Sequence, residues 1–557
     1  MTDSSPPPLP PKVRLRAALR NLLFIGLLAG VIGYAISQLW KPETVPSVSI
    51  PNDGAEVIAR QVDQAIQAEW TKENLSPVGK ADELTIMRRL GLALTGSVPS
   101  LEEIRQFESQ NETERIKWWV ARLLDDRRTS AYLAERFARA YVGVENGPFL
   151  VFRRHRMVRW LDDQIHSNRS YDKLVREMIA ADGIWTTHPG ANFITVTIDQ
   201  NNDKEGPDQV KLASRTARAF LGVRIDCMQC HDDMFGDRWK QKDFHQLAAF
   251  FAPAKVGVTG VQDDENNKDL IHKVRYRGDK DESPVSAAVP FRPDLLPKSG
   301  QLRDRLAEWT THPENGAFAR ASVNRVWAIL FNLSMTEVVD DIPLDGPYPA
   351  GMEILAEDFT ESGYDLQRLI RIIAATEAFQ MASESANPET NPVTGRHEET
   401  WAAFPLTRLR PEQMAGSVIQ AANLAALDAD AHIIKRIQRW AETNEFVKRY
   451  GDLGENEFGE QPGTIPQRLL MMNGKLVKER TDVNPLMSAA TRIATLSRDD
   501  SKAVDSAFLT VLSRRPTTKE HDHFVKSLSG KKGDKRSRAM TDLYWALLNS
   551  TEFSWNY

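Results

Sequence analysis

The stretch Cys227-Met228-Gln229-Cys230-His231 contains the only two cysteines of a 557-residue chain and places a histidine directly after the second one. This spacing, C-x-x-C-H, is the attachment pattern of a c-type haem. Two thiols one helical turn apart can each bond one vinyl group of the same porphyrin. The histidine can then ligate the iron from one face. The sequence therefore predicts haem c bound through Cys227 and Cys230, with His231 as an axial ligand.

Two other chemistries fit the same five residues. Zinc accepts mixed nitrogen and sulfur ligands. It can therefore be bound by Cys227, Cys230 and His231, with a fourth ligand such as His245. The two thiols can instead form a structural or redox-active disulfide, because C-x-x-C is also a thiol–disulfide motif. Haem, zinc and disulfide all stay open at this point.

The ligand on the second face of a haem iron is not obvious from the sequence. Met234 lies only three residues after His231, so we expect it to stay on the same face of the haem. His188, in a short loop, and His245 are the candidate sixth ligands; a five-coordinate iron or another methionine is equally open. His245 stands in the apolar helical stretch 244–251, a pattern also typical of a histidine on a buried helix face.

The N-terminus predicts export through a membrane. Basic residues between positions 12 and 20 precede an apolar run at 22–39, and about 18 residues are just enough to cross a bilayer as a helix. Positive charge before such a run places the N-terminus in the cytoplasm. We expect a disordered cytoplasmic tail at 1–19 and a single transmembrane anchor or cleaved signal segment at 20–40. The predicted location is the inner membrane, with the bulk of the chain in the periplasm, where haem c is attached.

Apolar residues at helical spacing predict a mainly α protein with two helical domains and minor β structure in the loops. After a tether at 41–54, the first domain covers 55–255 and includes the C-x-x-C-H motif. Residues 256–299 are rich in Asp, Asn, Lys and Gly, which indicates a linker between domains, with a short hairpin near Val274. The second helical domain covers 300–557.

Some helix boundaries are also predicted by local signals. Ser100 is followed three residues later by Glu103, a pairing typical of a capping box at a helix start. The composition excludes one large class of partner. The net charge of −5 leaves no basic footprint for nucleic acid.

Charged residues of the second domain are weaker candidates for function. Arg325 can bind an anion near the adjacent pair Asp340 and Asp341, but a buried ion pair between helix and loop is favoured for it. Two carboxylates can serve acid–base chemistry, although adjacent side chains need not point the same way. The acidic runs 263–265 and 279–282 are typical of solvated linker charge.

The chain resembles the planctomycete cytochrome-c-like domain of unknown function, followed by its companion planctomycete domain of unknown function. The first resemblance covers about 55–255 and rests on Arg88-Arg89-Leu90, Leu94-Thr95-Gly96, Pro99, Phe220-Leu221-Gly222-Val223, the C-x-x-C-H motif, Asp243-Phe244 and residues 247–251. The second covers about 300–555 and rests on Phe318-Ala319-Arg320, Val323-Asn324-Arg325-Val326-Trp327, Asp340-Asp341, residues 361–365, Pro466-Gln467, residues 545–550 and Glu552-Phe553.

The resemblance implies a cytochrome-like motif and leaves the reaction open. The family commonly continues the motif as C-x-x-C-H-D-H-P-F, whereas this chain has Asp233 and Met234 in place of the second histidine and the proline. A metal ligand at that histidine position would be missing here.

Together these features predict a membrane-anchored periplasmic haem protein that transfers electrons or belongs to an oxidoreductase system. Its expected partners are the membrane, through the N-terminal helix, and a redox or envelope protein. One alternative is a non-redox envelope interaction protein whose C-x-x-C-H holds zinc or a disulfide. Another is a glycan-related hydrolase in the companion domain. The sequence assigns no catalytic residue.

Overall fold

A computed structural model gives the fold of the chain. It describes Gly26 and residues 48–144, 152, 154–198, 206–234, 238–264, 266–267, 270–276, 279–427, 433–454, 458, 463–484 and 488–557. The chain divides into two compact units, Met1–Ser47 and Val48–Tyr557. Within the first unit only Gly26 is described, and it is helical.

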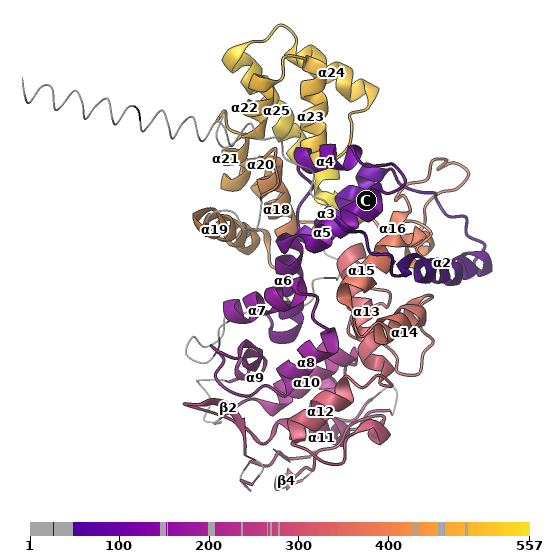
Figure 1. The fold of residues 1–557 in the computed structure, drawn as a ribbon, viewed down its shortest axis with the longest axis vertical. Helices are drawn as coiled ribbons and strands as arrows, with labels where there is room; N and C mark the ends of the chain where they lie inside the picture. The colour runs from indigo at the N-terminus through magenta and orange to yellow at the C-terminus, as the bar shows by residue number, and fades with distance from the viewer. Residues whose placement is uncertain are drawn as a thin grey trace, which may run out of the picture. The chain divides into compact units, whose positions relative to one another are not determined.

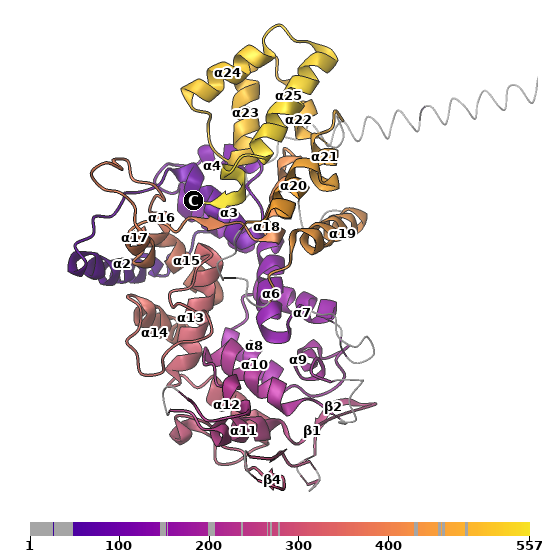
Figure 2. The ribbon, with the colours of Figure 1, turned by 180° about the vertical axis from the view of Figure 1, so that it is seen from behind.

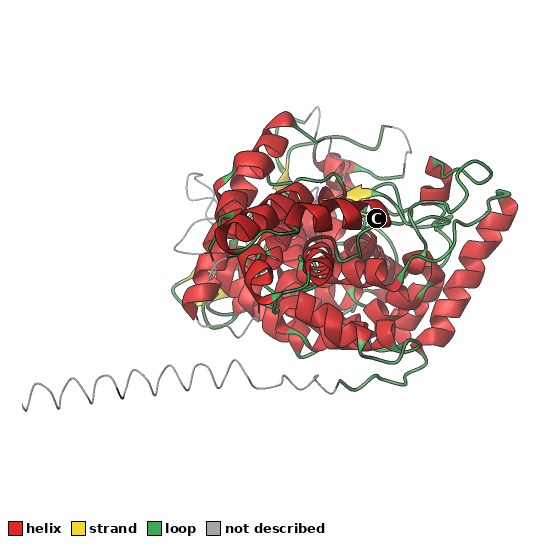
Figure 3. Cartoon of the chain, turned by 90° about the horizontal axis from the view of Figure 1, so that it is seen from above, coloured by secondary structure: helices red, strands yellow, loops and turns green. Residues whose placement is uncertain are grey.

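Helices dominate the described residues of the second unit (Figure 3), so the mainly helical fold class is confirmed. The helices before residue 300 are α2 (Ala55–Lys72), α3 (Glu83–Thr95), α4 (Leu101–Glu108), α5 (Arg115–Asp125), α6 (Arg127–Val142), α7 (Arg154–His166), α8 (Tyr171–Ile179), α9 (Asn192–Thr195), α10 (Gln209–Leu221) and α11 (Gln241–Ala248), with the 3-10 turns η1 (Pro189–Ala191), η2 (Asp226–Gln229) and η3 (Ala249–Phe251).

The remaining elements follow residue 250. The helices after residue 290 are α12 (Leu302–Thr310), α13 (Gly316–Phe331), α14 (Met352–Glu361), α15 (Leu366–Ala375), α16 (Glu377–Gln380), α17 (Gly395–Glu399), α18 (Pro411–Ala421), α19 (Ile433–Tyr450), α20 (Ile465–Asn473), α21 (Lys475–Thr481), α22 (Ala489–Leu496), α23 (Asp500–Leu512), α24 (Thr518–Leu528) and α25 (Gly533–Leu548), with the 3-10 turns η4 (Pro293–Leu295) and η5 (Glu552–Ser554). The strands form antiparallel pairs, β1 (Ala254–Gly257) with β2 (Gly260–Asp263), β3 (Lys273–Val274) with β4 (Ser283–Pro284), and β5 (Thr407–Arg408) with β6 (Trp555–Asn556).

The predicted membrane-spanning helix is not supported. Among the described residues, no helix is long and apolar enough to cross a bilayer. The 18-residue helix α2, for example, includes Glu56 and Asp63, and such charges are costly in hydrocarbon. This finding contradicts the predicted anchor and, with it, the single-pass inner-membrane location. The predicted segment itself, 20–40, lies outside the described residues apart from Gly26, as do the predicted tail at 1–19 and residues 41–47 of the predicted tether.

Local capping fixes where several helices begin. Ser100 and Glu103 form the predicted capping box: the Ser100 hydroxyl accepts the Glu103 N–H at 3.1 Å, and the Glu103 carboxylate accepts the Ser100 N–H at 2.8 Å. Both residues are buried, so these backbone groups have no access to water. The box therefore satisfies donors that would otherwise be left without a partner.

The two halves of the sequence share one apolar core. Tyr171, at the start of α8, stacks on Phe318 of α13 with ring centroids 5.6 Å apart. The backbone N–H of Tyr171 donates to the Tyr364 carbonyl at 3.1 Å. Figures 1 and 2 show α8 close to α13 from both sides. Residues 48–557 therefore pack as a single body, with the second half completing the core of the first.

The C-terminal residues are tied to helix α3. The guanidinium of Arg89 donates to the carbonyl oxygens of Phe379, Met381 and Tyr557 at 3.0, 2.7 and 2.6 Å. Arg88, beside it, donates to the Phe553 carbonyl at 3.3 Å. Figure 1 marks the chain end beside α3, in agreement with these bonds. Both arginines are fully buried, so their charge is stabilised by backbone carbonyls rather than by water.

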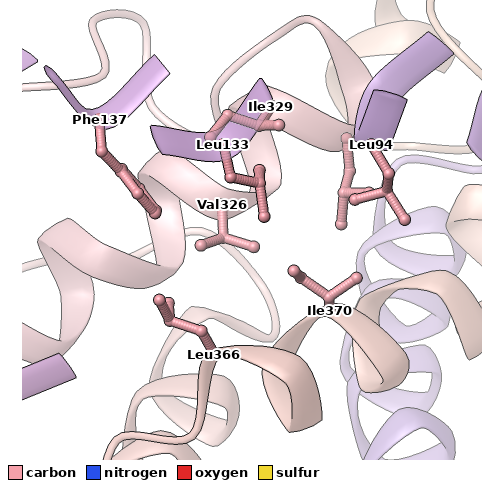
Figure 4. A pocket seen from close by; sticks show the side chains of 8 residues that line it. Leu94, Leu133, Phe137, Val326, Ile329, Leu366 and Ile370 are labelled. Carbon is pink, nitrogen blue, oxygen red and sulfur yellow. The ribbon is translucent and has the colours of Figure 1, made fainter. Parts of the chain in front are cut away.

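A small cavity lies in the shared core. It is lined by eight apolar side chains from α3, α6, α13 and α15: Leu94, Leu133, Phe137, Val326, Ile329, Leu330, Leu366 and Ile370 (Figure 4). Its volume of about 10 Å³ is at the lower limit for one water molecule, and no polar group lines it. The cavity is therefore a packing gap and contains no residue of the C-x-x-C-H motif.

A buried carboxyl group joins α2 to α16. Asp63 is 8% exposed, and its Oδ1 accepts the backbone N–H of Glu377 at 2.8 Å. Burial raises the pKa of Asp63 to about 7, although the hydrogen bond from Glu377 opposes the shift. At neutral pH this contact between distant parts of the chain is thus close to its titration point.

We expect the stability of the Asp63→Asn variant to fall less than that of the wild type as the pH rises from about 4 to about 7. The carboxyl binds its proton more tightly in the folded chain than in the unfolded chain, whose pKa is near 3.8. The free energy of unfolding therefore falls as the pH rises from about 4 to about 7. Asn keeps the acceptor for Glu377 and should remove a loss on the order of 2 kcal/mol at pH 8.

Urea unfolding at pH 5 and pH 8 measures this difference. The exposed Asp281→Asn variant is the control and should follow the wild type. Parallel pH dependence in the wild type and Asp63→Asn would contradict the prediction.

Candidate functional site

The C-x-x-C-H motif follows a sharp turn at the end of α10. Gly222 ends this helix in a left-handed conformation with φ of 62°. A Cβ atom at this position would lie 2.9 Å from Ile342 Cδ1 and 3.2 Å from Ala321 Cβ. The Gly222 carbonyl also accepts the Ile342 N–H at 2.7 Å. Glycine is therefore required here both for its conformation and for the close approach of another segment.

Both cysteines lie at the surface as free thiols. The motif enters the 3-10 turn η2, in which residues three apart lie on the same side. Cys227 and Cys230 have this separation, whereas Met228 between them is buried with 7% exposure. The turn thus directs the methionine into the core and both thiols outward.

His231 is half-buried, and one of its two ring nitrogens forms a hydrogen bond. Its Nδ1 lies 2.7 Å from the backbone carbonyl oxygen of Asp232. A carbonyl oxygen only accepts, so Nδ1 carries the proton and Nε2 keeps its lone pair. In the part of the chain that the structure describes, Nε2 makes no hydrogen bond. This hydrogen bond holds the ring in the orientation from which the Nε2 of a neutral imidazole can ligate a metal.

His245 faces the inner side of the motif rather than the outer side. Its Nε2 donates to the Gln229 carbonyl oxygen at 3.1 Å, and Gln241 Nε2 donates to the same oxygen at 3.1 Å. Its Nδ1 lies 2.9 Å from Nε2 of His272, whose other nitrogen contacts Gln209. Burial lowers the pKa of His245, which favours its neutral form. Both ring nitrogens are thus engaged in holding the motif.

Asp340 and Asp341 differ in burial and in hydrogen bonding, although the charges of Arg218 and Arg224 act on both. The Asp340 carboxylate is 7% exposed and accepts from Arg218 Nε at 2.7 Å and from Arg224 Nε at 2.9 Å. Asp341 is exposed. Arg325 is buried beside the rings of Tyr141 and Tyr171, and its Nε has no hydrogen-bond partner among the described residues. The expected grouping of Arg325 with the two aspartates is therefore not what the structure gives.

A scan against protein-family models matches two consecutive regions of the chain. Residues 61–256 match PSCyt2, a protein of unknown function (DUF1549). Residues 302–461 match PSD1, a protein of unknown function (DUF1553). The chain carries the PSCyt2 and PSD1 domains in this order. The predicted domain pair is confirmed, and searches of curated proteins and of solved structures find no match.

The C-x-x-C-H motif lies in PSCyt2, whereas Asp340 and Ile342 lie in PSD1. Residues from PSD1 thus contact the turn on which the PSCyt2 motif is built. The remaining candidate, His188, is exposed in the loop before η1. Its described hydrogen bonds are with Thr187, Ile184 and Ala191, and none of them joins it to the motif.

Sequence reasoning missed His272, the partner of His245. It lies between PSCyt2 and PSD1, in the stretch that was expected to be a solvated linker. The structure buries His272 at 7% exposure, just before β3. The expected solvation is also wrong for Asp263, whose carboxylate is buried and accepts from Arg303 Nε at 2.8 Å. A lone histidine beside a predicted hairpin was the only signal available.

The described residues contain no group of three or more His, Cys, Asp or Glu side chains that could hold a metal ion. For the zinc alternative, this means that His245 does not join Cys227, Cys230 and His231. Its ring is directed at Gln229 and His272 instead. The two thiols are thus exposed at the surface, and His245 contacts the Gln229 carbonyl between them from the buried side, with His272 behind it.

We expect His245→Ala to lower the free energy of unfolding by about 1–3 kcal/mol, because a buried donor on His272 and an acceptor on Gln229 each lose a partner. His245→Gln should recover part of this loss, since its amide can also donate to Gln229. Urea unfolding measures all variants.

The control is His188→Ala, which removes an exposed histidine and should change stability by less than about 0.5 kcal/mol. Equal losses for His188→Ala and His245→Ala, or no loss in either, would argue against a supporting role for His245.

Proposed function

We propose that the chain binds one haem c covalently through Cys227 and Cys230, with His231 as an axial ligand, and that it acts in electron transfer. The observation that carries this proposal is the joint geometry of the three residues. Two free thiols lie on the outer side of one 3-10 turn, and the next residue keeps an uncommitted Nε2 lone pair. The motif's position in PSCyt2, a domain of unknown function, agrees with it.

The donor set fits this group. Each sulfur would be joined to the porphyrin by a thioether bond, formed as the S–H adds across a vinyl group, so no oxidant and no leaving group are required. The hydrogen bond from His231 Nδ1 to the Asp232 carbonyl fixes the ring tautomer and raises the basicity of Nε2. When bound, haem c supplies a one-electron couple between ferric and ferrous iron.

The protein holds the turn of the C-x-x-C-H motif rigidly and at the surface. The Gln229 carbonyl, between the two cysteines, is held by donors from His245 and Gln241, so the turn cannot rotate freely. Because both thiols are exposed, the bound haem would lie at the surface, where a redox partner can approach. Electron transfer needs this proximity to the surface and no further catalytic residue.

The hydrolase alternative has no support of its own. Asp340 is occupied by two guanidinium groups, so its carboxylate is not available as a general acid or base. A protein that carries haem, zinc or a disulfide differs in mass and colour from the other two. One experiment therefore distinguishes the three alternatives.

We expect the full chain, produced together with a haem c attachment system, to gain the mass of one haem and to give the spectrum of a thioether-linked haem in alkaline pyridine. The variant with both Cys227→Ala and Cys230→Ala should lose the covalent haem, because no sulfur remains to bond the porphyrin. Intact-mass measurement and absorption spectroscopy report both results.

His188→Ala is the matched control for the histidine candidates and should bind haem like the wild type, whereas His231→Ala should change the Soret band. A wild-type chain with the mass of the bare polypeptide, with one bound zinc ion or with two hydrogens fewer would contradict the proposal.

A further inference from the structure

We infer that PSD1 completes the C-x-x-C-H site of PSCyt2, and that Asp340 is the positioning residue through which it does so. The inference deepens the proposed function and rests on it only where haem is the readout. Asp340 touches neither the cysteines nor His231; it acts through Arg218 and Arg224.

The carboxylate of Asp340 joins the two ends of the turn that leads into the motif. Arg218 lies on the last turn of α10, and Arg224 lies three residues before Cys227. Each donates its Nε–H to a different oxygen of Asp340, at 2.7 and 2.9 Å. Hydrogen bonds between two charged groups are about twice as strong as neutral ones. One buried carboxylate therefore fixes the distance between helix end and motif.

Charge explains why a carboxylate is needed at this point. Arg218 and Arg224 both converge on the same oxygen pair, so without Asp340 two like charges would face each other. Arg218 also lies 3.9 Å from the carboxylate of Asp226, the first residue of η2. Negative and positive side chains thus alternate in the order Asp340, Arg218, Asp226. Asp226 directly precedes Cys227 in the sequence.

Backbone and apolar contacts reinforce the same junction. The Ile342 N–H donates to the Gly222 carbonyl at 2.7 Å, two residues from Asp340 in sequence. Ile342 is buried in a small cluster with Ala321 of α13 and Met352 of α14. The PSD1 segment that contacts the turn is therefore itself anchored on two helices of PSD1.

A third contact lies on the other side of the motif. Arg238 forms an ion pair with Asp345 at 2.9 Å. The Asp345 side chain is 82% exposed, so this pair contributes little to stability. It nevertheless shows that one PSD1 stretch, 340–345, meets PSCyt2 both before and after C-x-x-C-H. We conclude that the orientation of the thiols depends on PSD1.

Asp340→Asn in the full chain tests this inference, with Asp341→Asn as the matched control. Asn keeps the size of the side chain but turns one acceptor into a donor that faces a guanidinium. Hydrogen exchange at residues 223–231 of the haem-free protein should become roughly tenfold faster or more in Asp340→Asn. Asp341 is exposed and accepts none of these hydrogen bonds, although its charge acts on Arg218 and Arg224, so Asp341→Asn should accelerate exchange less than Asp340→Asn does.

Thiol reactivity and haem provide two further readouts. The alkylation rates of Cys227 and Cys230 in the haem-free protein should shift more in Asp340→Asn than in Asp341→Asn, which removes a charge but no hydrogen bond. In the haem-loaded protein, Asp340→Asn should lower the fraction of chains that bind haem and displace the midpoint potential. Arg224→Gln, which keeps the bond between Arg218 and Asp340, should reproduce the local effects if Asp340→Asn fails to fold.

Local acceleration confined to residues 223–231 supports the inference. Wild-type exchange and alkylation in Asp340→Asn, or acceleration spread evenly over the whole chain, would overturn it. If the wild type binds no haem at all, the proposed function fails, while the exchange and alkylation measurements still decide the role of Asp340.

Discussion

Tyr171 stacks on Phe318, and its backbone bonds to Tyr364, so that the first helices of PSD1 close the core of PSCyt2. The packing of PSCyt2 therefore depends on its contact with PSD1. A PSCyt2 domain without PSD1 would expose Tyr171 and the apolar residues around it, which are fully buried in the whole chain. Exposing them costs about 25 cal/mol for each Å² of apolar surface. The two domains are thus separate matches in sequence and one body in structure.

The candidate site likewise depends on buried contacts beneath it. The proposed haem attachment uses the two exposed thiols and the half-buried imidazole of His231. The inner side holds the motif, with the Gln229 carbonyl bound by His245 and Gln241. Because these supports are buried and made of neutral hydrogen bonds, they stabilise the turn without adding charge near the site. An exposed turn that is held from beneath agrees with the electron-transfer role proposed above.

Much of this could be predicted from the sequence wherever the signal is local. The capping box of Ser100 and Glu103 depends on three-residue spacing, and the mainly helical pattern depends on periodicity, so both were expected. The pairing of His272 with His245 and the burial of Asp263 against Arg303 depend on contacts between distant segments. The amino-acid composition around these residues is that of a solvated linker. The local sequence does not distinguish a charged side chain that has a buried partner from one that stays in water. The predicted membrane helix is contradicted for a different reason: it was inferred from an apolar run and the basic residues before it, and no described helix is long and apolar enough to cross a bilayer.

The arginines of α3 have a consequence for how the protein matures. Arg88 and Arg89 are translated early, yet the carbonyl groups of Phe553 and Tyr557 that bind their guanidiniums emerge from the ribosome hundreds of residues later. While the chain is being synthesised, the two guanidinium groups therefore stay in contact with water, because the part of the fold that buries them is not yet present. The native environment of α3 is therefore complete only after residues 553–557 have been synthesised, so the folding of this N-terminal helix depends on one of the most distant segments of the described chain.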